Sequence, residues 1–205
     1  MSRRNFPARG LAAGLVLICL IGTAGFLSIE YLKNNARWIV YDTLAGLSDS
    51  SLANANLVEG FNRTVLALTS DSPTERERYV SESAAYNQQV NSSIAAYARS
   101  VFSAEDLANY NSLLRSRRVY MEVRKQTLAL LDQREEAQAR ELFKTSLVPS
   151  YRVYKSTAER VMKYNADEGR ERGEVIMQIC SVTQVVIAGA SIALFVLGFL
   201  LGLFK

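Results

Sequence analysis

Two long stretches without a charged residue stand near the ends of this chain of 205 residues, and they constrain its fold more than any other feature. The first is GLAAGLVLICLIGTAGFLSI, residues 10–29, and the second is VVIAGASIALFVLGFLLGLF, residues 185–204. A helix of about twenty residues measures about 30 Å, which is the thickness of the hydrocarbon core of a bilayer. The sequence therefore predicts two transmembrane helices, over 10–29 and 182–204, with the lipid bilayer as a partner.

The charges beside these spans predict the topology. Arg3, Arg4 and Arg9 precede the first span without an acidic residue, and Lys205 follows the second. All 20 acidic residues lie between the spans, together with the other 20 of the 24 basic residues, so the middle of the chain is neutral. Because cytoplasmic flanks carry an excess of Arg and Lys, we expect both termini in the cytoplasm and residues 30–181 outside it.

Composition excludes several classes of function. The chain has no histidine, which rules out catalytic triads and metal sites built on imidazole. Its two cysteines, Cys19 and Cys180, are too few for a disulfide scaffold or a zinc site. The neutral middle offers no basic patch for nucleic acid. No nucleophile stands beside a base, so we expect no enzyme, no metal and no cofactor.

Between the spans, apolar residues recur at alternating spacings of three and four, which is typical of helices that pack in a bundle. The helices are expected over residues 30–70, 73–101, 104–131 and 134–181. The positions expected to face inward in the first three are Leu44, Leu47, Ser51, Asn54, Val58, Phe61, Val65, Leu68; Val80, Ser83, Asn87, Val90, Ile94, Tyr97, Val101; and Tyr110, Leu113, Arg117, Tyr120, Val123, Thr127, Leu130. Polar residues among them either set the register or line a small polar cavity.

The connections between these segments are short, so neighbouring helices run antiparallel. Ser72, Ser103 and Asp132 are the expected N-caps of the second, third and fourth helices. Pro149 is expected to kink or interrupt the fourth helix. The fold class is therefore all-α: an antiparallel up-down-up-down four-helix bundle, whose first and fourth helices continue into the transmembrane helices. The domains are a tail over 1–9, two spans and a bundle over 30–181.

Three local features accompany this pattern: Asn62-Arg63-Thr64 in the first helix, the turn from Leu130 to Ala137, and Leu147-Val148-Pro149-Ser150-Tyr151 in the fourth. With them, the chain resembles the ligand-sensing half of a bacterial methyl-accepting chemotaxis protein, in particular its four-helix-bundle sensor domain. The resemblance implies a chemotaxis receptor of the bacterial inner membrane, with its sensor domain in the periplasm. It also implies a homodimer that binds a small solute and transmits a helix shift across the membrane.

Such receptors continue after the second span into a HAMP linker and a cytoplasmic coiled coil, whereas this sequence stops at Lys205. Both a sensor-only protein and a fragment of a longer receptor fit that observation. A third possibility is a membrane-anchored structural or interaction protein that pairs with another receptor.

In this family, small anionic or amino-acid-like ligands bind near the membrane-distal end through arginine, whose guanidinium holds a carboxylate by two parallel hydrogen bonds. At the corresponding depth, the resemblance points to six ligand-binding residues: Arg63, Asn62, Lys144, Tyr151, Arg152 and Tyr154. The alternative is that Arg63 is a solvated surface residue and the tyrosines pack in the bundle. A basic stretch in the third helix is expected to be a solvated face: Arg115, Arg117, Arg118, Arg124 and Lys125.

Overall fold

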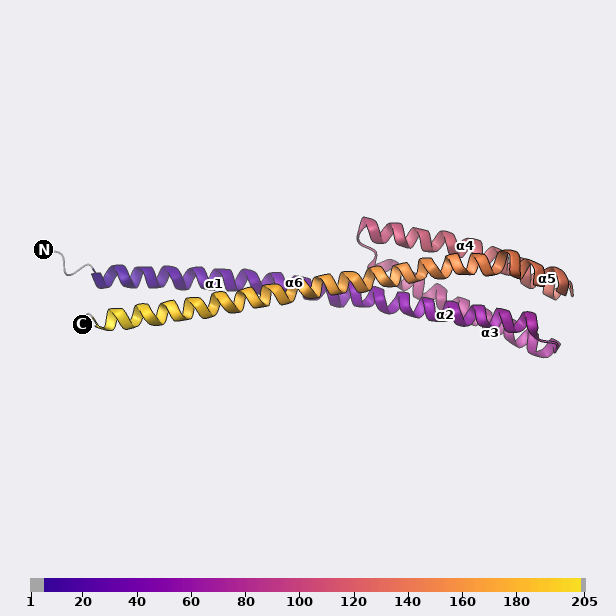
Figure 1. The fold of residues 1–205 in the computed structure, drawn as a ribbon, viewed down its shortest axis with the longest axis horizontal. Coiled ribbons are helices and arrows are strands. Elements are labelled where there is room, and N and C mark those ends of the chain that lie inside the picture. Colours follow the sequence, from indigo (N-terminus) through magenta and orange to yellow (C-terminus); the bar gives the residue numbers. More distant parts are fainter. Residues whose placement is uncertain (1–5, 204–205) are drawn as a thin grey trace. The chain divides into compact units, whose positions relative to one another are not determined.

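The computed structural model describes residues 6–203, and this part of the chain contains helices and their connections only (Figure 1). Its elements are α1 (Phe6–Trp38), the π-helical turn η1 (Ile39–Thr43), α2 (Leu44–Thr69), α3 (Pro73–Tyr97), the 3-10 turn η2 (Ala98–Ser100), α4 (Ala104–Asp132), α5 (Glu136–Leu142), the π-helical turn η3 (Phe143–Leu147) and α6 (Val148–Leu203). The predicted all-α fold class is confirmed. Arg3, Arg4 and Lys205, on which the predicted topology rests, and the last residue of the second predicted span lie outside the described residues.

The chain divides into two compact units. The bundle is the unit Val40–Gly169, and the other unit contains the residues up to Ile39 and from Arg170 onward. This second unit holds two helical segments that are long and apolar enough to cross a membrane. Their apolar side chains are exposed rather than packed into a protein core: Phe26 is 67 % exposed and Phe195 is 76 % exposed.

The core of the bundle has two clusters, and the larger one receives side chains from α2, α3, α4 and α6. Three tyrosines, Tyr97 of α3, Tyr120 of α4 and Tyr154 of α6, are 1–2 % exposed and fill its centre. Aromatic side chains contribute large buried apolar areas, so these rings supply much of the packing energy. The other buried members are Ala53, Leu57, Val90, Ile94, Leu113, Leu147, Ala158 and Val161.

Two of the three predicted N-caps are confirmed. The hydroxyl of Ser72 accepts a hydrogen bond from the backbone N–H of Glu75 at 3.4 Å, and Pro73 occupies the first turn of α3. The hydroxyl of Ser103 accepts from the N–H of Asp106 at 2.9 Å at the start of α4. Each cap satisfies one of the backbone donors that a helix leaves unpaired at its N-terminus.

The prediction that Asp132 caps the fourth helix is wrong. Asp132 is the last residue of α4, and α5 begins without a side-chain cap. Arg134 adopts a left-handed backbone conformation, with φ 63°, and the N–H of Glu135 donates to the carbonyl of Leu130 at 2.9 Å. This arrangement closes the C-terminus of α4, so the turn residues terminate one helix instead of starting the next.

Pro149 interrupts the fourth helix as predicted, and the form of the interruption is a π-helical turn. The segment η3 ends at Leu147, two residues before Pro149, which is the second residue of α6. Proline has no backbone N–H and its ring crowds the carbonyl four residues earlier. A wider π turn at that point accommodates both effects.

The inward face of α2 differs from the prediction by one residue. The structure buries Ser50, Ala53, Leu57, Gly60, Thr64 and Ala67, each one position before a residue expected to face inward. Leu68 is buried as predicted. The shifted face consists mostly of small side chains, and it packs against α3, where Ser83 donates to the carbonyl of Gly60. As a consequence, Leu44 and Leu52 point outward and are 52 % and 54 % exposed.

Candidate functional site

A buried arginine joins three helices inside the bundle. Arg124 of α4 is 7 % exposed, so the expectation that it belongs to a solvated face is wrong. Its Nε donates to the hydroxyl of Thr64 of α2 at 3.2 Å, and its Nη2 donates to the hydroxyl of Ser83 of α3 at 2.7 Å. Burial lowers the pKa of the Arg124 guanidinium, and the neighbouring Tyr120 opposes that shift.

The two hydroxyls do not require this arginine for their own hydrogen bonding. The carbonyl oxygen of Gly60 accepts from Thr64 at 3.0 Å and from Ser83 at 2.7 Å, and the two hydroxyls lie 2.9 Å apart. A hydroxyl has one proton to donate, and each already has an acceptor for it. Arg124 therefore donates to lone pairs of these two hydroxyl oxygens, and the hydroxyls have their own acceptor without it.

No carboxylate neutralises Arg124 within the described residues, whereas two other partly buried arginines of the bundle have acidic partners. Arg63 pairs with Glu82 at 3.2 Å, and the largely buried Arg76 pairs with Glu136 at 2.7 Å. A charge taken out of water without an opposite charge carries an uncompensated desolvation cost of several kcal/mol. Arg124 is thus a buried positive charge held by neutral oxygens alone.

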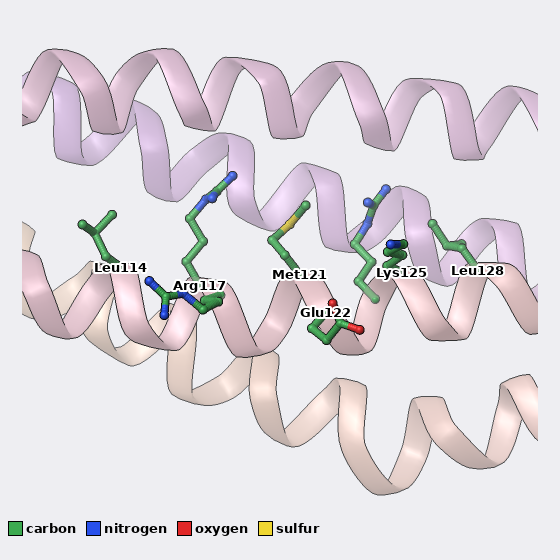
Figure 2. A pocket seen from close by; sticks show the side chains of 8 residues that line it. Leu114, Arg117, Met121, Glu122, Lys125 and Leu128 are labelled. Carbon is green, nitrogen blue, oxygen red and sulfur yellow. The ribbon is translucent and has the colours of Figure 1, made fainter.

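Arg124 also lines an open groove of about 690 Å³ along α4. Figure 2 shows Leu114, Met121 and Leu128 following one another along α4 on the side of its neighbouring helices. These three apolar residues are spaced by seven, so they share one face of the helix. The full lining is Leu114, Arg117, Arg118, Met121, Glu122, Arg124, Lys125 and Leu128. Four cationic side chains and one carboxylate therefore surround an apolar floor.

A second arginine of this groove also reaches α3. Arg117 is half-buried, and its guanidinium donates to the side-chain oxygen of Asn91. Its Nε is buried without a hydrogen-bond partner. The remaining members of the predicted solvated stretch are exposed, in agreement with the prediction: Arg115, Arg118 and Lys125.

Two spacings in the sequence indicate that Arg124 faces the bundle interior. Arg124 follows Arg117, which was assigned to the inward face, by seven residues and Tyr120 by four. Both spacings keep a residue on the same helix face. The buried stripe of α4 is accordingly Leu113, Ser116, Tyr120, Arg124, Thr127 and Leu131.

The six residues predicted to bind ligand have different surroundings. Tyr151 stacks on Phe61 with ring centroids 3.7 Å apart, and Tyr154 is 2 % exposed beside Tyr120 in the core. Arg63 is half-buried in its ion pair with Glu82. The other three are exposed: Asn62, Lys144 and Arg152. None of the six lines the α4 groove.

A second buried polar cluster lies at the opposite end of the bundle. The hydroxyl of Tyr97 donates to the carboxylate of Asp106, which is 3 % exposed, and accepts from Asn165 at 3.1 Å. Burial raises the pKa of the Asp106 carboxyl, and nearby Glu168 adds to the shift. The cluster joins α3, α4 and α6 through side chains rather than through apolar packing.

An antiparallel helical bundle with two candidate membrane-spanning segments defines a membrane-anchored helical module. The family model described as a four helix bundle sensory module for signal transduction matches residues 10–175. The chain therefore belongs to this family of sensory modules, which is not a family of enzymes. No curated protein matches the chain.

Proposed function

We propose that this protein is a chemoreceptor sensor of a bacterial inner membrane, which binds a small extracytoplasmic solute and passes a helix shift across the membrane. The observation that carries the proposal is the composition of α6, a single helix over Val148–Leu203. Its first half contributes Tyr154, Val161 and Asn165 to the bundle interior, and its second half carries exposed apolar residues such as Phe195. A shift of α6 in the bundle therefore has a direct covalent route into the apolar segment.

The contacts of α6 suit a shift between two packed arrangements. Besides its apolar contacts, α6 is held by a hydrogen bond between Thr157 and Ser116 at 2.6 Å and by one from Asn165 to Tyr97 at 3.1 Å. Packed helices change position in discrete steps because interdigitated side chains and hydrogen bonds have few alternative partners. A solute drives such a step only if it binds one arrangement more tightly than the other.

We propose a homodimer as the working unit, with α2 at the interface. The outward face of α2 carries Leu44, Leu52 and Leu66, which are 37–54 % exposed. The whole helix has three charged residues, Asp49, Glu59 and Arg63, and Arg63 pairs with Glu82 of α3. An exposed apolar face with few charges is typical of a helix that packs against another copy.

The test of signalling uses the full chain in lipid nanodiscs. Amino acids and short carboxylates are first screened for an increase in the unfolding temperature. Cysteine is then placed at Met177 of α6, which is 67 % exposed, in a background that lacks Cys19 and Cys180. A saturating hit is expected to change the rate of thiol modification at position 177 at least about twofold. A cysteine at exposed Ala85 of α3 is the control and keeps its rate.

Two results would contradict this proposal. The first is a screen in which no compound of either class raises the unfolding temperature. The second is a bound compound that leaves the modification rate at position 177 unchanged, because the solute would then bind without moving α6.

A further inference from the structure

We propose that the α4 groove is a binding site for a small carboxylate that carries an apolar group, with Arg124 as its charge anchor. The inference deepens the proposed sensor function by naming the site and the ligand class, and it relies on that function only for the consequence of binding. It rests on three features of the described residues: a buried cation without a carboxylate, an apolar floor beside it, and a buried phenol next to the guanidinium.

The first feature is the uncompensated charge of Arg124. Arginine stays protonated at physiological pH, so burial cannot be relieved by loss of the proton. Ser83 and Thr64 donate to the carbonyl of Gly60 whether or not the guanidinium is present. Their hydrogen bonding therefore gives no reason for an arginine at this position. A carboxylate at the groove would supply the missing opposite charge and make charge-assisted hydrogen bonds.

The second feature is the shape and chemistry of the groove itself. Leu114, Met121 and Leu128 form its apolar floor, and Arg117 adds a second guanidinium that is likewise bound to a neutral oxygen. Two guanidinium-bearing residues seven positions apart on a helix are separated by about 10 Å along its axis. A ligand with one carboxylate at Arg124 places its apolar group on Met121, between these two arginines. Binding sites of this kind combine an apolar lining with a few polar groups that fix orientation.

The third feature is the hydroxyl of Tyr120. The ring is 1 % exposed, and its buried oxygen has only Thr64 as a weak polar neighbour, without a hydrogen bond of normal geometry. Tyr120 lies close enough to Arg124 to oppose the fall that burial causes in the pKa of the guanidinium. Buried polar groups without a partner are rare in folded proteins. The hydroxyl of Tyr120 is therefore a weakly bonded donor beside the guanidinium. A ligand that rearranges the side chains around Arg124 gains this donor.

Occupancy of this site has a defined structural consequence. Arg124 holds α4 to α2 through Thr64 and to α3 through Ser83. A carboxylate that takes these N–H groups competes with both contacts, so it changes how α4 packs on the α2–α3 pair. The site thereby links ligand binding to a helix position, which is what the proposed sensor function requires.

The experiment measures binding by the full chain in nanodiscs with three probes: 3-phenylpropionate, its uncharged amide, and acetate. 3-Phenylpropionate is expected to bind at least about tenfold more tightly than either of the others, because only it has both the charge and the apolar group. Arg124→Gln is expected to weaken its binding at least about tenfold. Arg115→Gln is the matched control, because Arg115 is an exposed residue of the same helix that donates to Ser112 and lies outside the groove.

A second measurement separates a ligand anchor from a structural residue. Without ligand, Arg124→Gln is expected to keep or raise the unfolding temperature, since it removes a buried charge and leaves the Gly60 hydrogen bonds in place. A clear fall in the unfolding temperature would assign Arg124 a structural role and overturn the proposal.

The binding data also contain results against the proposal. Equal affinity for the acid and the amide would leave an apolar site without an anion anchor. Loss of binding in Arg63→Gln together with normal binding in Arg124→Gln would place the ligand at the site expected from the family resemblance. Absence of binding by 3-phenylpropionate overturns the groove proposal, while a solute found in the wider screen would still support the sensor function.

Discussion

Gly46 is a position where the bundle leaves no room for one additional methyl group. A Cβ atom there would lie 2.3 Å from the side-chain oxygen of Asn165 and 3.1 Å from the hydroxyl of Ser100. Asn165 cannot yield easily, because its amide donates to Tyr97 and to the carbonyl of Val161. Gly46→Ala is therefore expected to lower the free energy of unfolding by about 1–3 kcal/mol, the usual cost of overpacking.

Gly60→Ala is the matched control for this prediction. Its Cβ atom would make contacts at 3.4–3.8 Å with Tyr86, Asn87 and Ser83, which are ordinary van der Waals distances. Alanine also favours a helix by about 1 kcal/mol over glycine. Thermal unfolding followed by circular dichroism should separate the two variants, with Gly60→Ala close to the wild type. Equal losses in both would show that helix packing does not distinguish the two sites.

Asp106 makes the stability of the bundle depend on pH. Burial and the nearby Glu168 raise the pKa of its carboxyl above the ordinary 3.8, although the hydrogen bond from Tyr97 opposes the shift. The folded protein then binds this proton more tightly than the unfolded chain. Its contribution to the free energy of unfolding is therefore greatest below about pH 4 and is lost as the pH rises through the folded pKa.

Asp106→Asn removes this titration and keeps an oxygen that accepts from Tyr97. Between pH 4 and pH 8, denaturant unfolding should show a smaller loss of stability in Asp106→Asn than in the wild type. Glu105→Gln is the control, because Glu105 is an exposed neighbour on the same helix. Parallel pH profiles for the wild type and Asp106→Asn would contradict the assignment of this titration to Asp106.

At the scale of a helix, the exposed apolar face of α2 indicates that this helix packs against a partner. In a parallel two-fold dimer, equivalent residues near the axis approach each other. Single cysteines on the outward face, at Leu44, Leu52 and Leu66, are therefore expected to form disulfide-linked dimers in native membranes. Ala53, which is 6 % exposed, is the inward-facing control and should not cross-link.

The pattern along the helix decides the result of this experiment. Cross-linking that rises and falls with a period of three to four residues supports a helix–helix interface at α2. Uniform or absent cross-linking along the whole helix would leave α2 without a partner copy and would remove the dimer from the proposed mechanism.

The sequence predicted elements better than it predicted which face each element buries. Caps such as Ser72 and Ser103 act locally, through hydrogen bonds within a few residues, so the sequence indicates where those helices begin. The face that α2 buries depends on its packing against α3, where Ser83 donates to the carbonyl of Gly60, and this packing is a tertiary property. An apolar pattern of period three and four does not distinguish two buried faces whose positions differ by one residue.

The candidate site was missed for a related reason. A run of basic residues is usually a solvated face, and Arg115, Arg118 and Lys125 follow that rule. Arg124 departs from it because hydroxyls on two other helices, at Thr64 and Ser83, hold its guanidinium inside the bundle. The site combines side chains from three helices, so it can be recognised only once the packing of those helices is known.

At the scale of the whole molecule, the proposed function depends on which side of the membrane the bundle occupies. The flanks outside the apolar segments carry only basic charges, Arg3, Arg4 and Arg9 before the first and Lys205 after the second. Such charges favour the cytoplasmic side because positive residues resist translocation. The neutral region between the segments carries no comparable bias, so the bundle is expected outside the cytoplasm, where an external solute reaches the α4 groove.

Labelling with a membrane-impermeant thiol reagent tests this topology in intact cells, in a background that lacks Cys19 and Cys180. A cysteine at Asp71, an exposed residue of the turn between α2 and α3, is expected to react, and a cysteine at Ser2 is expected to react only after the membrane is permeabilised. Asp71 is preferred to the adjacent Ser72 because the Ser72 hydroxyl caps α3. The reverse labelling pattern would place the bundle in the cytoplasm. The groove and its arginines would then face cytoplasmic solutes, and sensing of an external solute would be excluded.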